Sequence, residues 1–260
     1  MSLYNTLRRG AFLTEGDPHP VRYFAEEVCS PFVLVSDHAG RAVPSALGRL
    51  GIPEAEHERH IAYDIGIQGV GRRLRPALGA ALIEQCYSRL VIDCNRSPGH
   101  PTSVPPVSDG TQIPANQALS EHERRVREDA ILHPYHAVIT AELDARTERP
   151  TALIALHSFT PVMQGVRRPW HAGVLFNRDS RLSHIVAGLL RAEGLCVGEN
   201  EPYVLTDTSD YTVPLHAEAR GLPYLEIEIR QDLIADEGGQ IEWAERLARL
   251  LPQAWRALSI

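Results

Sequence analysis

The sequence contains no lysine, since all 26 of its basic residues are arginines. A chain without lysine cannot use a phosphate-binding P-loop lysine, a Schiff-base lysine or a Ser-Lys dyad. Cysteine is also scarce, and Cys29, Cys86, Cys94 and Cys196 form no C-x-x-C pair of the kind found in zinc ribbons and redox motifs. We expect these four cysteines to be small buried side chains in a reducing compartment.

An excess of positive charge and a long apolar run are both missing. The net charge is −7 and the isoelectric point is near 5.9, so we expect neither nucleic acid nor an anionic membrane surface as a partner. No uninterrupted apolar run approaches the ~20 residues that span a bilayer. Residues 1–5 do not begin a charged and then apolar leader, so we expect no signal peptide and a cytoplasmic protein.

The chain does contain short apolar runs that alternate with helical patterns. Its 260 residues, 43% of them hydrophobic, predict one domain over 1–260. Buried strands are predicted at Phe32–Val35, Ala152–Leu156 and Tyr224–Ile229. The alternation favours a three-layer α/β sandwich with a central, largely parallel or mixed sheet. Further strands are expected at 21–25, 80–84, 90–93 and 171–176. Helices are expected at 54–75 with an interruption around Gly66 or Gly69, at 121–146 with a break near Pro134, and at 180–193, 214–220 and 242–257.

Two of the predicted strands lead into a histidine. His38 follows the first apolar run and His157 follows the run at 151–156, and the carboxyl ends of buried strands are where open α/β sheets bind their ligands. Zn²⁺ prefers imidazole nitrogen with one carboxylate, and a catalytic site leaves one position open. Asp64 is the expected third ligand. Asp37 is the alternative, or it orients a histidine from outside the ligand set.

Glu226 and Glu228 lie inside an apolar strand pattern, where an unpaired charge is costly. They are two residues apart, so both point to one face of their strand. One of them facing the metal can act as the general base that takes a proton from the attacking water. Glu228 is the expected base, with Glu226 as the alternative, and two solvated acids on an edge strand are the competing interpretation.

The segment Asp93-Cys94-Asn95-Arg96 also follows an apolar run. Arg96 can hold a substrate carboxylate through a bidentate ion pair, and Asn95 can add an amide hydrogen bond. Arg89 is expected to assist. The alternative is that Asp93 and Arg96 only pair with each other.

Two further features point to contacts with a substrate. The stretch between Ser97 and Ala118 contains five prolines, and a loop of this length inside a compact domain more often serves as a lid or a substrate contact than as a simple connection. His60, His171 and His216 are weaker candidates for orienting a substrate, and His216 is the one we assign to substrate binding. Ser158 lacks the G-x-S-x-G motif that a serine hydrolase of the α/β type requires.

Taken together, several segments resemble the N-formylglutamate amidohydrolase family. They lie between about residues 32 and 232 and read Ser36-Asp37-His38-Ala39-Gly40, Tyr63-Asp64-Ile65-Gly66, Ser88-Arg89-Leu90-Val91-Ile92-Asp93-Cys94-Asn95-Arg96, Leu156-His157-Ser158-Phe159 and Leu225-Glu226-Ile227-Glu228-Ile229-Arg230. The resemblance implies a phosphorylase/hydrolase-like sandwich of the zinc carboxypeptidase-like kind. It also implies metal-dependent hydrolysis of an N-acyl amino acid, typically N-formylglutamate in histidine catabolism.

The resemblance carries over residue by residue. His38 and His157 fall in the family's metal-binding motifs, Glu228 matches its strand glutamate, and Asn95-Arg96 matches its carboxylate-binding pair. This chain departs from the deformylases where Asp37 precedes the first histidine and Ala39 follows it, and in the loop after Arg96.

We therefore expect a hydrolase acting on a linear amide bond, with Zn²⁺ or another divalent cation such as Co²⁺ on His38, Asp64 and His157. Glu228 and Arg96 are the expected catalytic residues, and Asn95, Arg96, Arg89 and His216 are expected to bind the substrate. The alternatives are a non-catalytic protein that binds small carboxylates, and an amidase for a different N-acyl substrate.

Overall fold

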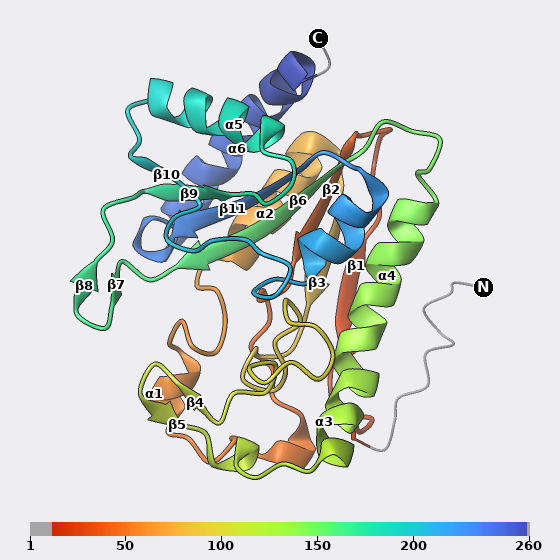
Figure 1. Cartoon of the computed structure of the whole chain (residues 1–260), viewed down its shortest axis with the longest axis vertical. Helices are drawn as coiled ribbons and strands as arrows, with labels where there is room; N and C mark the ends of the chain where they lie inside the picture. The colour runs from red at the N-terminus through yellow and green to blue at the C-terminus, as the bar shows by residue number, and fades with distance from the viewer. Residues whose placement is uncertain (1–11, 259–260) are drawn as a thin grey trace.

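Seven strands form one central sheet in the computed structural model, which describes residues 12–258 (Figure 1). In chain order they are β1 (Val21–Phe24), β2 (Phe32–Ser36), β3 (Ala81–Gln85), β6 (Ala152–Phe159), β9 (Ala172–Leu175), β10 (Val197–Glu199) and β11 (Tyr224–Arg230). Their order across the sheet is β1-β3-β2-β6-β11-β9-β10. The four central strands are parallel, whereas β1 and β9 run antiparallel to their neighbours β3 and β11. This mixed, mostly parallel sheet confirms the predicted fold class.

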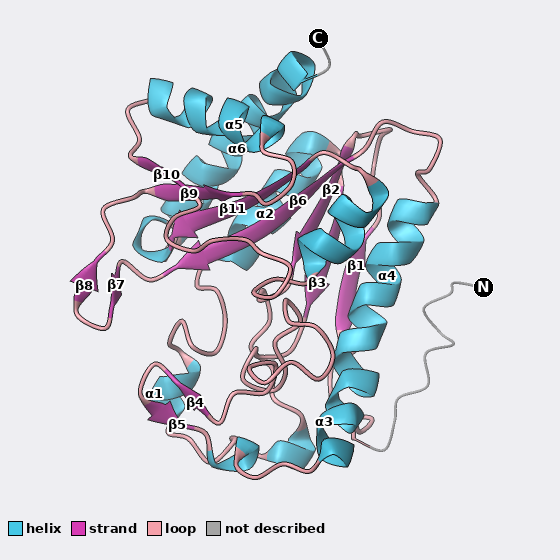
Figure 2. Cartoon of the chain, in the orientation of Figure 1, coloured by secondary structure: helices cyan, strands magenta, loops and turns pink. Residues whose placement is uncertain are grey.

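Each central strand buries both of its faces. Along β2, Phe32 and Leu34 pack into one hydrophobic cluster, and Val33 and Val35 pack into the other. This alternation is the two-residue period of a strand. The cluster around Phe32 lies under α2 (Ile67–Leu78), α5 (Arg181–Ala192) and α6 (Glu237–Leu258) (Figure 2).

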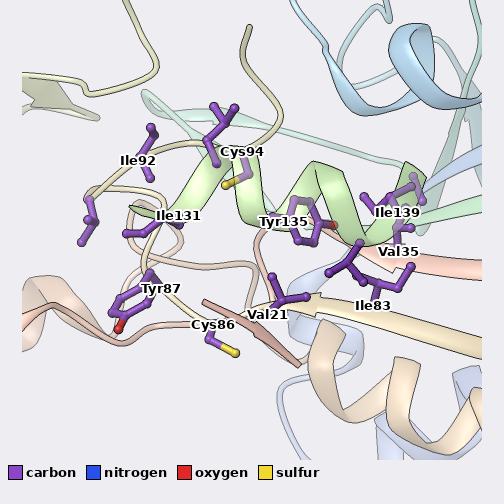
Figure 3. Close-up of a cluster of buried hydrophobic side chains, with 14 of the residues drawn as sticks. Val21, Val35, Ile83, Cys86, Tyr87, Ile92, Cys94, Ile131, Tyr135 and Ile139 are labelled. Atoms are coloured by element: carbon purple, nitrogen blue, oxygen red, sulfur yellow. The ribbon is translucent and has the colours of Figure 1, made fainter. Parts of the chain in front are cut away.

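The opposite face of the sheet is covered by α4 (His133–Asp144) and by η5 (Val213–Ala217). In Figure 3, Tyr135 and Ile139 of α4 point toward Val35 and Ile83 of the sheet. Helices on both faces give the three layers that the sequence predicts.

The helix predicted over 121–146 forms in three parts. The capping box of Ser120 and Glu123 begins α3 (Glu121–Arg127) as expected. A π-helical turn, η4 (Glu128–Leu132), then separates it from α4. Pro134 falls in the first turn of α4, where a missing backbone N–H costs little. The expected break is therefore real, but it lies just before the proline.

Two local predictions were wrong. Residues 90–93 form no strand, because Asn116 and Arg127 hydrogen-bond the carbonyl groups of Leu90 and Val91 in place of a neighbouring strand. The helix predicted over 54–75 is reduced to α1 (Glu54–His57) and α2, with residues 58–66 forming turns between them. Gly66 ends this connection at φ +82°.

The remaining elements are short. Two hairpins lie outside the central sheet (Figure 1): β4 (Val107–Ser108) pairs with β5 (Thr111–Gln112) beside α1, and β7 (Val162–Met163) pairs with β8 (Val166–Arg167) beyond the end of β6. The other short helices are η2 (Ser45–Leu47), η3 (Pro114–Asn116), η6 (Glu218–Arg220) and η7 (Gln231–Leu233).

Three further expectations meet the structure. Cys86 and Cys94 are buried as expected, but Cys29 and Cys196 are exposed, which corrects that prediction. Within residues 12–258, no helix combines the length and apolar character needed to cross a bilayer. The prediction about a signal peptide falls on residues outside the described range.

Candidate metal and hydrolase site

Three expected ligands from separate parts of the chain lie together at one end of the sheet. His38 follows β2, Asp64 lies in the turns before α2, and His157 lies within β6. Oδ2 of Asp64 is 3.5 Å from Nδ1 of His38 and 3.1 Å from Nδ1 of His157. Ligands of a tetrahedral Zn²⁺ with bonds of ~2.0–2.1 Å are about 3.3 Å apart. The separations therefore fit one small divalent cation.

Backbone contacts hold Asp64 at this position. Its own N–H donates to the carbonyl oxygen of His38 at 3.0 Å, and the N–H of Ser158 donates to its Oδ2 at 3.1 Å. Gly66 is needed two residues later, because a Cβ atom there would lie 2.1 Å from the carbonyl oxygen of Ile234. Hydrogen bonds thus hold Asp64 against both of the segments that carry the histidines.

A second carboxylate contacts the far nitrogen of each imidazole. Oδ1 of Asp93 lies 2.7 Å from Nε2 of His38, and Oδ2 of Asp37 lies 3.2 Å from Nε2 of His157. A carboxylate on one ring nitrogen leaves the lone pair of the other nitrogen for a metal. Nδ1 of His38 is buried and has no hydrogen-bond partner in the described part of the chain. This orphaned atom and the nearby Asp64 fit a metal ligand set.

Charge in the site favours a cation. Burial alone would raise the pKa of Asp64, but the two imidazoles and Arg89 hold it well below its usual value. Burial alone would lower the pKa of His157, but its carboxylate neighbours raise that pKa. Burial alone would also raise the pKa of Asp37, but His157, His38 and Thr212 lower that pKa to about 2. The negative field that attracts protons to these imidazoles also attracts a divalent cation.

Arg89 lies beside the ligand group and is only partly free for a substrate. Its Nη2 donates to Oδ2 of Asp93 at 2.6 Å, and its Nη1 donates to Oδ1 of Asp64 at 3.3 Å. The side chain is 27% exposed and lines the cleft. The pairing of Asp93 with Arg96, considered from the sequence, is replaced by these contacts with Arg89 and His38.

Asn95 and Arg96 mainly anchor the loop before η5. The side-chain amide of Asn95 donates to Asp210 at 2.9 Å and accepts from the backbone N–H groups of Tyr211 and Thr212. Arg96 donates to the carbonyl oxygens of Asn95 and Ser209. Both residues line the cleft, so the structure places them near a substrate but gives the Asn95 amide other partners.

Glu226 and Glu228 both face the site. Strand β11 pairs with β6 so that Glu228 is the register partner of His157. Both glutamates are buried, line the cleft and have an Oε2 atom without a hydrogen-bond partner among the described residues. Burial, opposed by the charges of the imidazoles, raises the pKa of Glu228 to about 7. A carboxyl group with this pKa can both accept and donate a proton near neutral pH.

His216 is not brought to the site. Its side chain is fully buried in η5, and its Nε2 lies 2.8 Å from Nδ1 of His136. It is absent from the residues that line the cleft. The predicted substrate contact is therefore corrected, because the apolar pattern around His216 packs η5 against the sheet. His60, ranked lower from the sequence, does line the cleft.

His38 and His157 of the ligand group line a cleft of about 570 Å³. Thr102, Pro105 and Val107–Asp109 contribute to its wall, so the proline-rich loop lies where the sequence predicts a substrate contact. Sequence reasoning missed Tyr203 and Val204 in the cleft and Thr212, whose Oγ1 donates to Asp37 at 2.6 Å. A loop pattern without apolar periodicity gave no signal for them.

The fold and this site define an α/β protein with a buried His-Asp-His group at the end of a mostly parallel sheet. The sequence model of the N-formylglutamate amidohydrolase family matches residues 30–235, and the chain belongs to that family. It is accordingly a hydrolase of amide bonds. A comparison with curated protein sequences finds no match.

Solved structures share the fold. The gene product Atu2144 from Agrobacterium tumefaciens is similar at a TM-score of 0.92 and 35% sequence identity, and the match covers 96% of this chain and 100% of that one. N-formylglutamate amidohydrolase from Ralstonia eutropha JMP134 is similar at a TM-score of 0.68 and 22% identity, covering 92% of this chain and 98% of that one. The second likeness supports the fold alone.

Proposed function

We propose that this protein is a metal-dependent amidohydrolase that cleaves the amide bond of an N-acyl amino acid, of which N-formylglutamate is the family example. The observation that carries the proposal is the ligand group itself. Three side chains separated by up to 119 positions present two imidazole nitrogens and a carboxylate oxygen within 4.8 Å of one another. Without a cation, the buried Nδ1 atom of His38 has no hydrogen-bond partner among the described residues, which is uncommon for a buried polar atom.

His38, Asp64 and His157 would hold the cation, and Zn²⁺ or Co²⁺ suits two nitrogen ligands and one oxygen ligand. When bound, such an ion polarises the amide carbonyl group and activates the attacking water. Asp93 is hydrogen-bonded to Nε2 of His38, and Oδ2 of Asp37 lies 3.2 Å from Nε2 of His157. These contacts would help to keep the two rings oriented toward a bound cation.

The proton transfer belongs to Glu228. Its unpartnered Oε2 in the cleft would take a proton from the attacking water and pass it to the leaving amine. Glu226 is the alternative base on the same strand face. Arg96, at the cleft wall, would pair with the substrate carboxylate, and Arg89 would add positive charge beside it.

The test is a metal and activity assay of the purified full chain. The protein, supplied with Zn²⁺ or Co²⁺, should bind about one metal ion and release free amine from N-acyl amino acids. Glu228→Gln should keep the metal and lose at least about 10²-fold in kcat, whereas His38→Asn should lose the metal. His184→Asn, at a half-exposed histidine on α5, is the matched control and should keep both.

Two results would overturn parts of this proposal. A parent protein that takes up no stoichiometric metal favours a non-catalytic carboxylate binder. Full turnover by Glu228→Gln, together with its loss in Glu226→Gln, transfers the proton-carrying role to Glu226.

A further inference from the structure

The mouth of the cleft carries an unusual share of exposed apolar side chains. Among the described residues, seven large hydrophobic side chains are exposed. Three of them, Val107, Tyr203 and Val204, line the cleft. Two more, Val162 and Val166, lie on the β7–β8 hairpin, whose Met163 also lines it. Single exposed hydrophobic residues are ordinary, but a cluster around one opening marks a binding surface.

The three segments that form this mouth are far apart in the sequence. They are the β4–β5 hairpin, the β7–β8 hairpin and the loop that carries Tyr203 and Val204, and the two hairpins project from the same side of the fold (Figure 1). Tyr203 is held in place, because Nη1 of Arg168 donates to its hydroxyl group at 3.1 Å and the guanidinium carbon lies 4.8 Å from its ring centroid. The apolar wall is therefore at least partly preformed.

The charges inside the cleft do not match a substrate with two carboxylates. Arg89 and Arg96 are the two arginines among the residues that line it. Both terminal nitrogens of Arg89 already donate to aspartates, whereas Arg96 donates from Nη1 to two backbone carbonyl groups and from Nε to Thr102, which leaves its Nη2. In the described part of the chain, this leaves room for pairing with one substrate carboxylate at Arg96 and offers no second unpaired guanidinium in the cleft.

The size of the cleft agrees with a larger ligand. Its volume of about 570 Å³ lies in the middle of the range for sites that bind drug-sized molecules. An N-formyl amino acid with a short polar side chain would leave much of this space, and the apolar mouth, in contact with water.

We infer that the preferred substrate is an N-acyl amino acid with a single carboxylate and an apolar group of several carbon atoms. The assignment rests on the proposed amidohydrolase function and specifies its substrate class. The carboxylate pairs with Arg96, the amide lies at the ligand group, and the apolar group packs against Val107, Tyr203 and Val204. Burying that group removes apolar surface of both molecules from water, which favours binding.

The experiment measures kcat/KM of the metal-loaded full chain on three substrates. N-formyl-L-leucine carries the apolar group on the amine side, N-octanoylglycine carries it on the acyl side, and N-formyl-L-glutamate has two carboxylates and no apolar group. We expect at least one of the first two to exceed N-formyl-L-glutamate by about tenfold or more, as one or two buried methylene groups allow.

Val204→Ser tests whether the mouth causes this preference. Val204 is 58% exposed, and the matched control Val28→Ser changes a valine that is 61% exposed and does not line the cleft. Val204→Ser should reduce the ratio of kcat/KM values, apolar substrate over N-formyl-L-glutamate, by roughly three- to tenfold. Val28→Ser should leave the ratio unchanged.

The outcomes separate the two proposals. Fastest turnover of N-formyl-L-glutamate, or the same ratio in Val204→Ser and Val28→Ser, overturns the substrate assignment and keeps the amidohydrolase. In the second case the exposed valines serve some other contact. Metal-loaded protein that hydrolyses none of the three substrates overturns the proposed function and the substrate assignment with it.

Discussion

Each imidazole of the site lies between two carboxylates. His38 has Asp64 at 3.5 Å and Asp93 at 2.7 Å, and His157 has Asp64 at 3.1 Å and Asp37 at 3.2 Å. The shared carboxylate of Asp64 lies on the side where a cation would bind. The other two lie behind the rings, and Asp93 makes a hydrogen bond with Nε2 of His38 there.

The outer carboxylates should therefore tune metal affinity without being ligands. Asp93→Asn keeps the shape of the side chain but removes the charge that increases the basicity of His38. We expect metal affinity, measured by competition with a chelator, to fall about 10–100-fold. Asp129→Asn, at an acid whose side chain is 77% exposed, is the matched control and should leave affinity unchanged. Equal affinities in the two variants would exclude a tuning role for Asp93.

A second pair of histidines, His136 and His216, behaves differently, because its hydrogen bonds among the described residues are to each other and to the backbone and not to a carboxylate. Nε2 of His136 lies 2.8 Å from the carbonyl oxygen of Cys94, so this nitrogen must donate. Nδ1 of a neutral His136 then accepts from Nε2 of His216. Burial, with smaller contributions from the neighbouring His136 and Arg220, lowers the pKa of His216 to about 3.

This pair predicts a pH dependence of stability. His216 stays neutral in the folded protein, whereas the unfolded chain takes up a proton below pH ~6.5. The contribution of neutral His216 to stability is fully present above pH ~6.5, and the free energy of unfolding falls as the pH decreases toward 3. Between pH 7.5 and pH 5.5, the free energy of unfolding from urea denaturation should fall by about 1.4 kcal/mol less in His216→Gln than in the parent. Equal losses would show that His216 does not contribute.

At the scale of elements, buried side chains replace regular backbone pairing around the cleft. Arg127 of α3 donates to the carbonyl oxygens of Val91 and Ala115 and to Oδ1 of Asn116, and its side chain is 2% exposed. Burial lowers its pKa to about 10. Arg127 thus holds together the two ends of the irregular segment 91–116, which forms one wall of the cleft.

Replacing this arginine should destabilise the protein. Arg127→Met keeps much of the apolar volume but leaves three buried acceptors without this donor, and each such loss costs about 1–3 kcal/mol. We expect the free energy of unfolding, from urea denaturation, to fall by about 2–4 kcal/mol. The matched control is Arg125→Met, because Arg125 lies on the same helix and its side chain is 61% exposed. Its free energy of unfolding should stay within about 0.5 kcal/mol of the parent value. Similar changes in both variants would mean that the segment is held by other contacts.

At the scale of the whole molecule, one sheet connects the two hydrophobic clusters. Neighbouring residues of β2 and β6 contribute to opposite clusters, so neither cluster can lose its packing without disturbing the sheet that both share. The three proposed metal ligands come from β6 and from the segments after β2 and before α2. The site is therefore complete only when the central strands are in register.

We accordingly predict that residues 1–260 unfold as one domain, in a single cooperative transition whose midpoint rises with metal. Free Zn²⁺ at about 100 times its dissociation constant should add about 2.7 kcal/mol to the free energy of unfolding. Calorimetry of the parent and of His38→Asn, with and without metal, measures the number of unfolding transitions and the shift of the midpoint with metal. Two separate transitions, or an equal rise in His38→Asn, would contradict this prediction.

The sequence alone determined the residue types and the strands that carry them. Short apolar runs bounded by polar residues identify β2, β6 and β11, and a polar residue at such a strand end or inside its pattern stands out locally, as His38, His157 and Glu228 do. These signals depend on neighbours in the chain, so they can be read without coordinates.

Only the tertiary structure decided which groups meet. Asp93 contacts His38 across 55 positions, Asp64 contacts His157 across 93, and Thr212 donates to Asp37 across 175. The roles expected for Asn95 and His216 depended on such contacts, and the folded chain gave those side chains other partners. The apolar mouth arises in the same way, because two hairpins and a loop that are far apart in the sequence lie together only in the folded chain.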